Sequence, residues 1–202
     1  LLALLAGHRS NVVSATFSPK GDRVLTVSWQ GDGRIWDAAT GQLLAAFDNG
    51  EPGGFGSGFS PDGRAVLTTA GPGAQLRDAE SGRLLAQLQG HSEWIHDAAF
   101  SPDGQRIVTA SYDGTLRLWN ADPAAHANPA VLLAPVDQYE NGGVDHLEFS
   151  ADGRRLLSGD DWGNVYVWDA NTSALISRLR HDDVPPRSIS SGRQPVFMGD
   201  GA

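Results

Sequence analysis

The segment Gly90–Phe100, GHSEWIHDAAF, gathers the residue types that transfer protons and attack carbonyl carbons. Its eleven positions hold two histidines, one serine, two acidic residues and one tryptophan. The first five residues approach the Gly-x-Ser-x-Gly turn that exposes a nucleophilic serine, but Trp94 stands where the second glycine is required. The residue types therefore allow acyl-transfer chemistry, while the spacing argues against a serine nucleophile.

Metal and phosphate chemistry have weaker support in this chain. Three clusters carry possible metal ligands, namely Asp145-His146, Asp160-Asp161 and His181-Asp182-Asp183. Neighbouring residues on a strand point to opposite faces, and no four-ligand spacing emerges, so we expect solvated loops. The glycine-rich run 53–58 neither follows a strand nor opens a helix, which argues against phosphate binding. We expect no metal and no cofactor.

Composition narrows the classes of partner. The net charge of −9 and the isoelectric point near 4.9 provide no global positive field for nucleic acid or an anionic membrane. The absence of cysteine fits a reducing compartment, so we expect a cytoplasmic protein. The opening LLALLAG is too short for a signal sequence or a membrane span. Fourteen of the 15 basic residues are arginine, which suggests a bacterial source.

An internal repeat organises the chain. The phrase Phe-Ser-Pro-Asp/Lys-Gly, with Ala for Pro in its last copy, places serines at positions 18, 60, 101 and 150. The spacings are 60 − 18 = 42, 101 − 60 = 41 and 150 − 101 = 49, so the period is near 41 with an insertion of about eight residues. We place that insertion in the segment 122–135.

Each repeat predicts four short strands. In the third repeat the runs Ile95–Phe100, Arg106–Ala110 and Thr115–Trp119 have β-branched or aromatic content and are bounded by turns. Fourth strands are expected at Leu43–Phe47, Leu84–Leu88 and Leu175–Leu179. Four antiparallel strands in about forty residues are typical of a propeller blade.

These features resemble the WD-repeat β-propeller family. The resemblance rests on Gly-His pairs before the first strand and Trp-Asp or Trp-Asn pairs after the third, at Gly7-His8, Gly90-His91, Trp36-Asp37, Trp119-Asn120 and Trp168-Asp169. Propellers of the peptidase-associated and surface-protein types share the Ser-Pro-Asp-Gly turn but lack the Gly-His pair. The resemblance implies an all-β chain of four-stranded antiparallel blades.

The resemblance also implies a domain organisation. We expect about four full blades and parts of a fifth, as an excerpt of a seven-bladed ring from a longer protein. The expected units are an outer strand of a preceding blade at 1–6, blades at 7–48, 49–89, 90–138 and 139–180, and the start of a further blade at 181–202.

The family's structural tetrad of hydrogen bonds carries over by position. The third repeat matches it completely with His91, Thr109, Asp113 and Trp119. The first repeat supplies His8, Thr26, Gln30 in place of aspartate, and Trp36; the fourth supplies Ser158 and Trp168, with Glu140 and Trp162 at the other two positions. In the second repeat Gly50 and Arg77 replace histidine and tryptophan, so no tetrad is expected. The Asp-His-Thr set imitates a catalytic triad, but no oxyanion-hole motif accompanies it, so we expect a structural role and no catalytic residue.

The resemblance further implies a partner-binding face at one end of the blades. Its positions here are Asn11, Val13, Trp29, Phe55, Trp94, His96, Tyr112, Asp145 and Asp161, with Trp162 beside them. Five of these ten residues are aromatic in a chain whose aromatic content is 8%, as expected of an interface hot spot. Trp29 and Trp94 have the alternative role of covering the central channel or the tetrads. Nearby acidic residues favour a protein or peptide partner that carries arginine or lysine.

Three functions remain open at this stage. The first is a non-catalytic protein-binding scaffold or sensor within a larger protein. The second is a propeller enzyme of hydrolase or lyase type, for which the inner strands offer only Asp97, His146 and Glu148. The third is a structural spacer, for which an aromatic face would be unnecessary.

Overall fold

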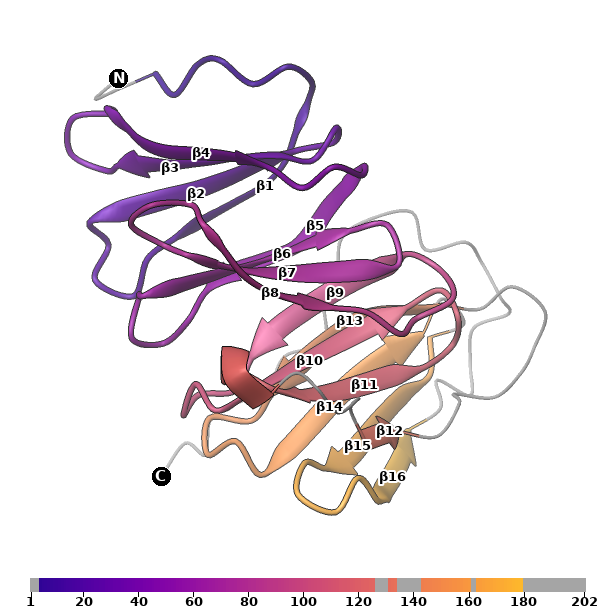
Figure 1. Ribbon diagram of the computed structural model, residues 1–202. Coiled ribbons are helices and arrows are strands. Elements are labelled where there is room, and N and C mark those ends of the chain that lie inside the picture. The colour runs from indigo at the N-terminus through magenta and orange to yellow at the C-terminus, as the bar shows by residue number, and fades with distance from the viewer. Residues whose placement is uncertain (1–3, 126–130, 134–142, 161–162, 180–202) are drawn as a thin grey trace.

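The protein is all-β, as a computed structural model that describes residues 4–125, 131–133, 143–160 and 163–179 shows (Figure 1). The described residues contain no α-helix and form four antiparallel sheets of four strands each. This arrangement confirms the expected fold class of propeller blades. No helix among these residues is long and apolar enough to cross a membrane.

Each sheet is formed by consecutive strands. The first sheet comprises β1 (Val12–Phe17), β2 (Arg23–Ser28), β3 (Asp32–Asp37) and β4 (Leu43–Asp48). The second comprises β5 (Gly53–Phe59), β6 (Ala65–Ala70), β7 (Gly73–Asp78) and β8 (Leu84–Leu88). The third comprises β9 (Ile95–Phe100), β10 (Arg106–Ser111), β11 (Leu116–Asn120) and β12 (Val131–Leu133), with a 3-10 turn, η1, at Pro123–Ala125. The fourth comprises β13 (Val144–Phe149), β14 (Arg155–Asp160), β15 (Val165–Asp169) and β16 (Leu175–Leu179).

The sheets occupy the four intervals expected for blades, with β12 as the one departure from the expected strands. Residues 4–6 lie in no strand and residues 1–3 lie outside the described residues, so the outer strand of a preceding blade expected at 1–6 stays a prediction. The strand β12 pairs with β11 inside the segment interpreted as an insertion. The start of a further blade at 181–202 lies outside the described residues.

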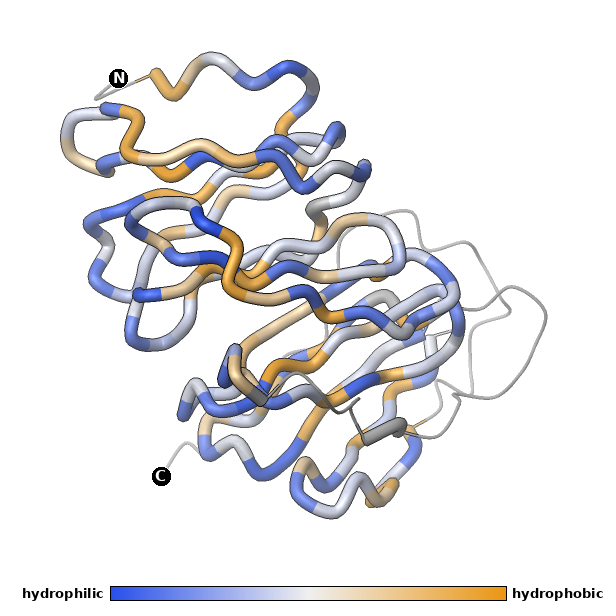
Figure 2. The backbone as a smooth tube through the Cα atoms, in the orientation of Figure 1, coloured by the Kyte–Doolittle hydropathy of each residue, from blue (hydrophilic) through white to orange (hydrophobic). Residues whose placement is uncertain are grey.

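The sheets stack in chain order, and three apolar clusters fill the spaces between them (Figures 1 and 2). Leu25 and Ile35 of the first sheet, both fully buried, pack with Val66 of the second. Buried apolar residues from the second and third strands of the sheets also supply most of the other two clusters. The first strands β1, β5, β9 and β13 are successive neighbours, so every sheet contributes its first strand to one shared inner row.

The Ser-Pro-Asp-Gly turns join the first and second strands at one end of each sheet. In the second sheet Ser60 Oγ donates to Asp62 Oδ1 at 2.6 Å, and the amide of Gly63 donates to the carbonyl of Ser60 at 2.8 Å. Gly63 has φ of 73°, a left-handed conformation that glycine adopts without strain. The hydrogen bond from Ser60 holds the pKa of Asp62 below its ordinary value. These turns mark the end of the sheets opposite to the β10–β11 turn.

Candidate functional site

The third sheet contains the complete tetrad that the sequence predicts. The Nε1 of Trp119 donates to Thr109 Oγ1 at 2.9 Å, and Thr109 Oγ1 lies 2.8 Å from Nε2 of His91. The other ring nitrogen of His91 lies 2.8 Å from Asp113 Oδ2, which also accepts the amide of Ser92 at 3.1 Å. Burial would raise the pKa of Asp113, but hydrogen bonds from His91 and Thr115 outweigh it and hold that pKa well below its ordinary range.

This bonding pattern excludes Thr109 as a nucleophile. The hydroxyl oxygen accepts a hydrogen bond from the indole N–H, and its single O–H donates a hydrogen bond to Nε2 of His91, so the N–H of the imidazole is at Nδ1 and donates to Asp113. A catalytic triad has the same order of bonds, but its nucleophilic oxygen must face a substrate. Thr109 is fully buried and its oxygen is already engaged by Trp119. The set therefore stabilises the blade.

The first sheet forms a tetrad with a different acid from the one expected. His8 Nδ1 lies 2.6 Å from Asp32 Oδ2, whereas the side chain of Gln30 is exposed. The assignment of Gln30 to the tetrad is wrong, because Asp32 stands at the position of Thr115 in the third sheet. Thr115 Oγ1 also approaches its histidine, at 3.2 Å from Nδ1 of His91, so this position faces the imidazole in both sheets.

The rest of the first tetrad is as expected. Thr26 Oγ1 lies 2.6 Å from Nε2 of His8 and accepts the indole N–H of Trp36 at 2.7 Å. Asp32 also accepts a short hydrogen bond from Ser28 Oγ. Burial would raise the pKa of Asp32, but the bonds from Ser28 and His8 outweigh it and lower the pKa.

In the second sheet a network around a buried arginine replaces the tetrad. Arg77, at the tryptophan position, donates to the carbonyls of Gly82 at 3.0 Å and Asp48 at 2.8 Å, and its guanidinium lies 4.7 Å from the ring centre of Phe47. Burial lowers the pKa of Arg77. Thr68 Oγ1 donates to Asn49 Oδ1 at 3.2 Å, so Asn49 takes the place of the missing histidine.

The fourth sheet keeps half of the tetrad among its described residues. The indole N–H of Trp168 donates to Ser158 Oγ at 3.0 Å. Asp160 Oδ2 accepts from Asn164 Nδ2 at 2.8 Å and from the hydroxyl of Tyr166 at 3.3 Å. Glu140 and Trp162, expected at the remaining positions, lie outside the described residues.

Five predicted face residues lie at the end of the sheets that carries the turns between second and third strands, opposite to the Ser-Pro-Asp-Gly turns. Their rings form one continuous row, in the order Trp94, Trp29, Phe55, His96, Tyr112. The ring centres of Trp94 and Trp29 are 5.7 Å apart, and those of Trp29 and Phe55 are 5.4 Å apart. His96 stacks on Phe55 at 5.5 Å with an interplanar angle of 14°, and Tyr112 meets His96 edge-on at 5.4 Å. The row crosses the first three sheets, and we call it the aromatic row.

The aromatic row is open to solvent. Trp29 and Phe55 are each 41% exposed and Tyr112 is 47% exposed, while Trp94 and His96 are half-buried. Large aromatic groups of this kind are usually covered in a monomer unless they serve as a contact surface. The rings also contact each other, so the row is preorganised and little side-chain entropy remains to be lost on binding.

The remaining predicted face residues contribute unequally. Asn11 is exposed, and its carbonyl accepts the amide of Trp29 at 2.8 Å, which fixes the start of the β2–β3 turn. Val13 is half-buried in β1. The side chain of Asp145 and both Asp161 and Trp162 lie outside the described part of the chain.

Two of the three channel residues considered for catalysis, Asp97 and His146, form a pair that links two sheets. Asp97 Oδ2 lies 3.4 Å from Nδ1 of His146 and accepts the amide of Leu147 at 3.1 Å, while Asp97 Oδ1 accepts the amide of Ala98 at 2.8 Å. Asp97 therefore joins β9 to β13. Across the described ranges, no three His, Cys, Asp or Glu side chains are grouped as a metal site requires.

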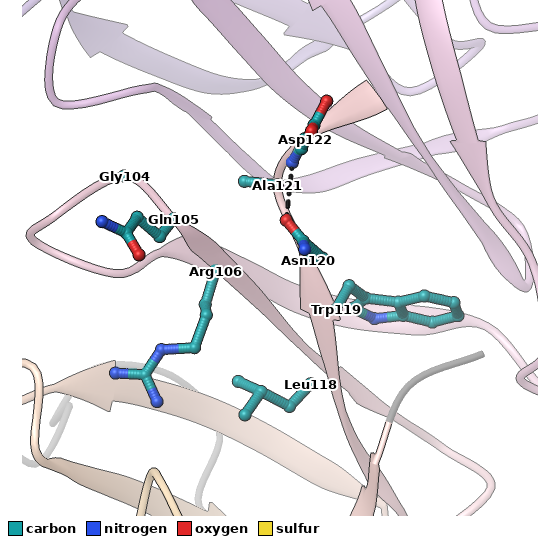
Figure 3. Close-up of a pocket in the computed structure, with 8 residues that line it drawn as sticks. All are labelled: Gly104, Gln105, Arg106, Leu118, Trp119, Asn120, Ala121 and Asp122. Carbon is teal, nitrogen blue, oxygen red and sulfur yellow. Dashed lines mark hydrogen bonds between the residues drawn. The ribbon is translucent and has the colours of Figure 1, made fainter. Parts of the chain in front are cut away.

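A cavity of about 650 Å³ opens at the turn end of the third sheet (Figure 3). It is lined by Gly104, Gln105, Arg106, Leu118, Trp119, Asn120, Ala121 and Asp122. Figure 3 shows Arg106 and Trp119 pointing in different directions from neighbouring strands. The guanidinium of Arg106 is engaged by carbonyls of the fourth sheet, so the cavity offers no convergent set of catalytic groups.

Comparison with known families agrees with this geometry. The family model described as "WD domain, G-beta repeat" matches residues 1–37, 82–120 and 134–169. No curated protein matches the chain. The gap between the first two matched stretches contains β4, β5, β6 and β7, and in β7 Arg77 stands in place of the tetrad tryptophan.

Proposed function

Since this chain belongs to the WD-repeat family, whose domains are generally non-catalytic and bind protein partners, we propose that it binds a protein through the aromatic row. The single observation that carries this proposal is the continuous contact of five partly exposed rings across three sheets. Aromatic anchors supply much of the binding energy of protein interfaces. A structural spacer would have no use for such a surface.

The charges around the aromatic row favour a basic partner segment. The segments that carry or flank the rings, 28–31, 50–56, 91–97 and 111–114, contain no lysine or arginine. Glu51 and Glu93 are exposed among them. A guanidinium or ammonium group would therefore meet ring faces and carboxylates, each of which attracts it. We propose a partner peptide that carries arginine or lysine.

The setting of this module is a further part of the proposal. We infer a longer bacterial protein of several domains, supported by the family resemblance and by the use of arginine over lysine. We also infer a cytoplasmic location, for which the absence of cysteine is the support.

A peptide-display selection against the intact chain tests the partner chemistry. We expect selected peptides to be enriched in arginine or lysine and to lose about 30-fold or more in affinity for the double variant Trp29→Ala/Tyr112→Ala, since one hot-spot aromatic contributes about 2 kcal/mol or more and such contributions are not additive. The matched control is Phe17→Ala, which removes an exposed ring outside the aromatic row. Equal affinity for wild type and the double variant would contradict the proposed site.

A further inference from the structure

The junction between the first and second sheets holds a guanidinium group in a defined acceptor. Arg23, the first residue of β2, donates from Nη2 to the carbonyl of Gly63 at 2.7 Å and from Nη1 to that of Ala79 at 3.2 Å. Its guanidinium carbon lies 5.5 Å from the ring centre of Phe59. The acceptor therefore combines two charge-assisted hydrogen bonds with a cation–π contact.

The junction between the third and fourth sheets holds a guanidinium group in the same way. Arg106, the first residue of β10, donates to the carbonyls of Gly153 at 2.8 Å and Ala170 at 2.6 Å. Its guanidinium carbon lies 5.8 Å from the ring centre of Phe149. Its Nη1 also donates to Asn171 Oδ1 at 3.2 Å. Two carbonyls and one ring at fixed repeat positions are therefore a recurring acceptor for guanidinium.

The junction between the second and third sheets repeats the backbone of this acceptor. The amide of Ala121 donates to the carbonyl of Gln105 at 2.8 Å, as the amide of Ala79 does at the equivalent position of the second sheet, also at 2.8 Å. Gly104 has φ of 70°, close to the 73° of Gly63. The carbonyls of Gly104 and Ala121 are therefore placed as the carbonyls of an occupied acceptor are.

No arginine of β6 fills this third acceptor. Ala65 is the first residue of β6, the position that Arg23 holds in β2. Nη2 of Arg23 lies 3.4 Å from the point where a Cβ on Gly63 would stand. Apart from the sequence neighbours of Gly104, only Pro61 among the described residues lies within 4 Å of that point on Gly104. Gly104 is accordingly half-exposed, whereas Gly63 is buried.

The second and third sheets are nevertheless as close at this place as two sheets that an arginine joins. Pro61 Cδ lies 3.5 Å from the point where a Cβ on Gly104 would stand. Pro102 Cδ lies 3.5 Å from the same point on Gly153, at the junction that Arg106 occupies. The third acceptor therefore has the sheet spacing of an occupied one.

A ring and a carboxylate complete the third acceptor. Phe100 stands at the repeat position of the two rings that the arginines contact and packs against the cluster between the second and third sheets. Asp122 is exposed and stands at the repeat position of Asn171, so it offers a carboxylate where the fourth sheet offers an amide oxygen. Asp122 lines the cavity of Figure 3 together with Gly104 and Ala121.

We propose that this junction binds a guanidinium group from outside the chain, carried by free arginine or by an arginine side chain of a partner. The group donates to the carbonyls of Gly104 and Ala121 and to the carboxylate of Asp122, and it lies over the ring of Phe100. A planar guanidinium suits two carbonyls, whereas an ammonium is a point charge. The site lies among the Ser-Pro-Asp-Gly turns, opposite to the aromatic row, and is separate from it.

NMR titration of the intact chain tests this site. We expect an acetylated and amidated Gly-Arg-Gly peptide to shift the amide signals of Gly104, Ala121 and Asp122 in a saturable way. The same peptide with citrulline, which keeps the shape but loses the charge, or with lysine should bind about 10-fold or more weakly. Titration with free arginine separates the two sources, because a partner's side chain is indicated where the peptide binds more tightly and a small molecule where free arginine does.

Two substitutions address the acceptor itself. Ala65→Arg should abolish binding, because the new guanidinium occupies the site from within the chain. Asp122→Asn should raise the dissociation constant of the Gly-Arg-Gly peptide about 10-fold, since it replaces a charge-assisted hydrogen bond by a neutral one. The matched control is Glu80→Gln, which removes an exposed carboxylate at the same repeat position of the second sheet, where Arg23 already fills the acceptor. This control should bind like wild type.

The aromatic row supplies the contrast that decides the location. The double variant Trp29→Ala/Tyr112→Ala should bind the Gly-Arg-Gly peptide at the junction as wild type does. Binding that this double variant loses and Ala65→Arg keeps would place the peptide on the aromatic row and overturn the proposal. An affinity that neither Ala65→Arg nor Asp122→Asn changes, or no binding of peptide and free arginine at all, would overturn it too and would leave the aromatic row untouched as a site.

Discussion

His8 Nδ1 and Asp32 Oδ2 lie 2.6 Å apart and join the segment before β1 to the start of β3 in the first sheet. Asp32 is only 6% exposed and also accepts from Ser28, so its removal leaves two buried donors without an acceptor. We expect Asp32→Ala to lower the free energy of unfolding by about 2–4 kcal/mol, because each orphaned donor costs about 1–3 kcal/mol. Urea denaturation of the intact chain measures this loss.

The matched control for Asp32 is its neighbour in the same turn. Gln30 is exposed, and its substitution by alanine should change the free energy of unfolding by less than about 0.5 kcal/mol. An equal loss of free energy of unfolding for Gln30→Ala and Asp32→Ala would contradict this assignment, because it would make Gln30 a partner of His8 in the first tetrad.

The pH dependence of stability should depend on the tetrad carboxylates. The pKa of Asp113 is lowered from the ordinary value of 3.8, so the folded state binds its proton less readily than the unfolded state does. The stabilisation from Asp113 is therefore complete above pH 3.8 and is lost as the pH falls through its folded pKa. Asp32 acts in the same direction.

Urea midpoints between pH 6 and pH 2 check this dependence. We expect Asp113→Asn to be less stable than wild type near pH 6 and to lose less stability on acidification, since the asparagine side chain does not titrate. Some acid sensitivity should persist in the variant, because hydrogen bonds from Ser60 and Ser101 also lower the pKa values of Asp62 and Asp103. Parallel curves for wild type and variant would exclude Asp113 as a source of the acid sensitivity.

The tryptophan of the third tetrad should combine packing and hydrogen bonding. Trp119 is 6% exposed and packs in the cluster between the second and third sheets. We expect Trp119→Ala to cost about 3–5 kcal/mol as a large-to-small core substitution. Trp119→Phe keeps an aromatic ring but loses the indole N–H, so we expect a smaller loss. A cost below about 1 kcal/mol for Trp119→Ala in urea melts would contradict the tetrad's structural role.

The repeat made much of the structure predictable. Thr26 and Trp36 are separated by ten residues, as are Thr109 and Trp119, and each pair forms the same hydrogen bond. Equal spacing in sequence placed equivalent residues at equivalent points of each sheet, which is why the fully matched tetrad was predicted. The five rings of the aromatic row were predicted by position in the same way, although their mutual contacts were not.

The features that the sequence did not predict depend on the three-dimensional path of the backbone and not on the spacing of residues in the sequence. The acid of the first tetrad is two residues beyond the expected Gln30, because a carboxylate at either of two nearby positions can accept from the imidazole, as Asp113 does in the third sheet and Asp32 in the first. The hydrogen bond from Arg23 to the carbonyl of Gly63 spans 40 residues of sequence. An arginine at the start of a strand has the same local pattern as a solvent-exposed charge, so only the stacking of the sheets identifies its partners.

At two junctions between the described sheets, an arginine at the start of a second strand clamps the next sheet: Arg23 donates to the carbonyls of Gly63 and Ala79, and Arg106 to those of Gly153 and Ala170. The junction between the second and third sheets lacks this clamp, so the clamp can be added there. Ala65 is the first residue of β6, where the first, third and fourth sheets have arginine. Across from it, the third sheet has the acceptor geometry: the amide of Ala121 donates to the carbonyl of Gln105 at 2.8 Å. Gly104 and Ala121 both line the cavity of Figure 3.

We therefore expect Ala65→Arg to raise the free energy of unfolding by about 0.5–2 kcal/mol, the usual range for one well-placed stabilising substitution. The gain should come from hydrogen bonds to the carbonyls of Gly104 and Ala121 and from a cation–π contact with Phe100. Ala65→Lys is the matched control, because its single ammonium lacks the planar fork that reaches two carbonyls. An Ala65→Arg variant no more stable than Ala65→Lys in urea melts would show that the arginines at the other junctions do not act through this geometry.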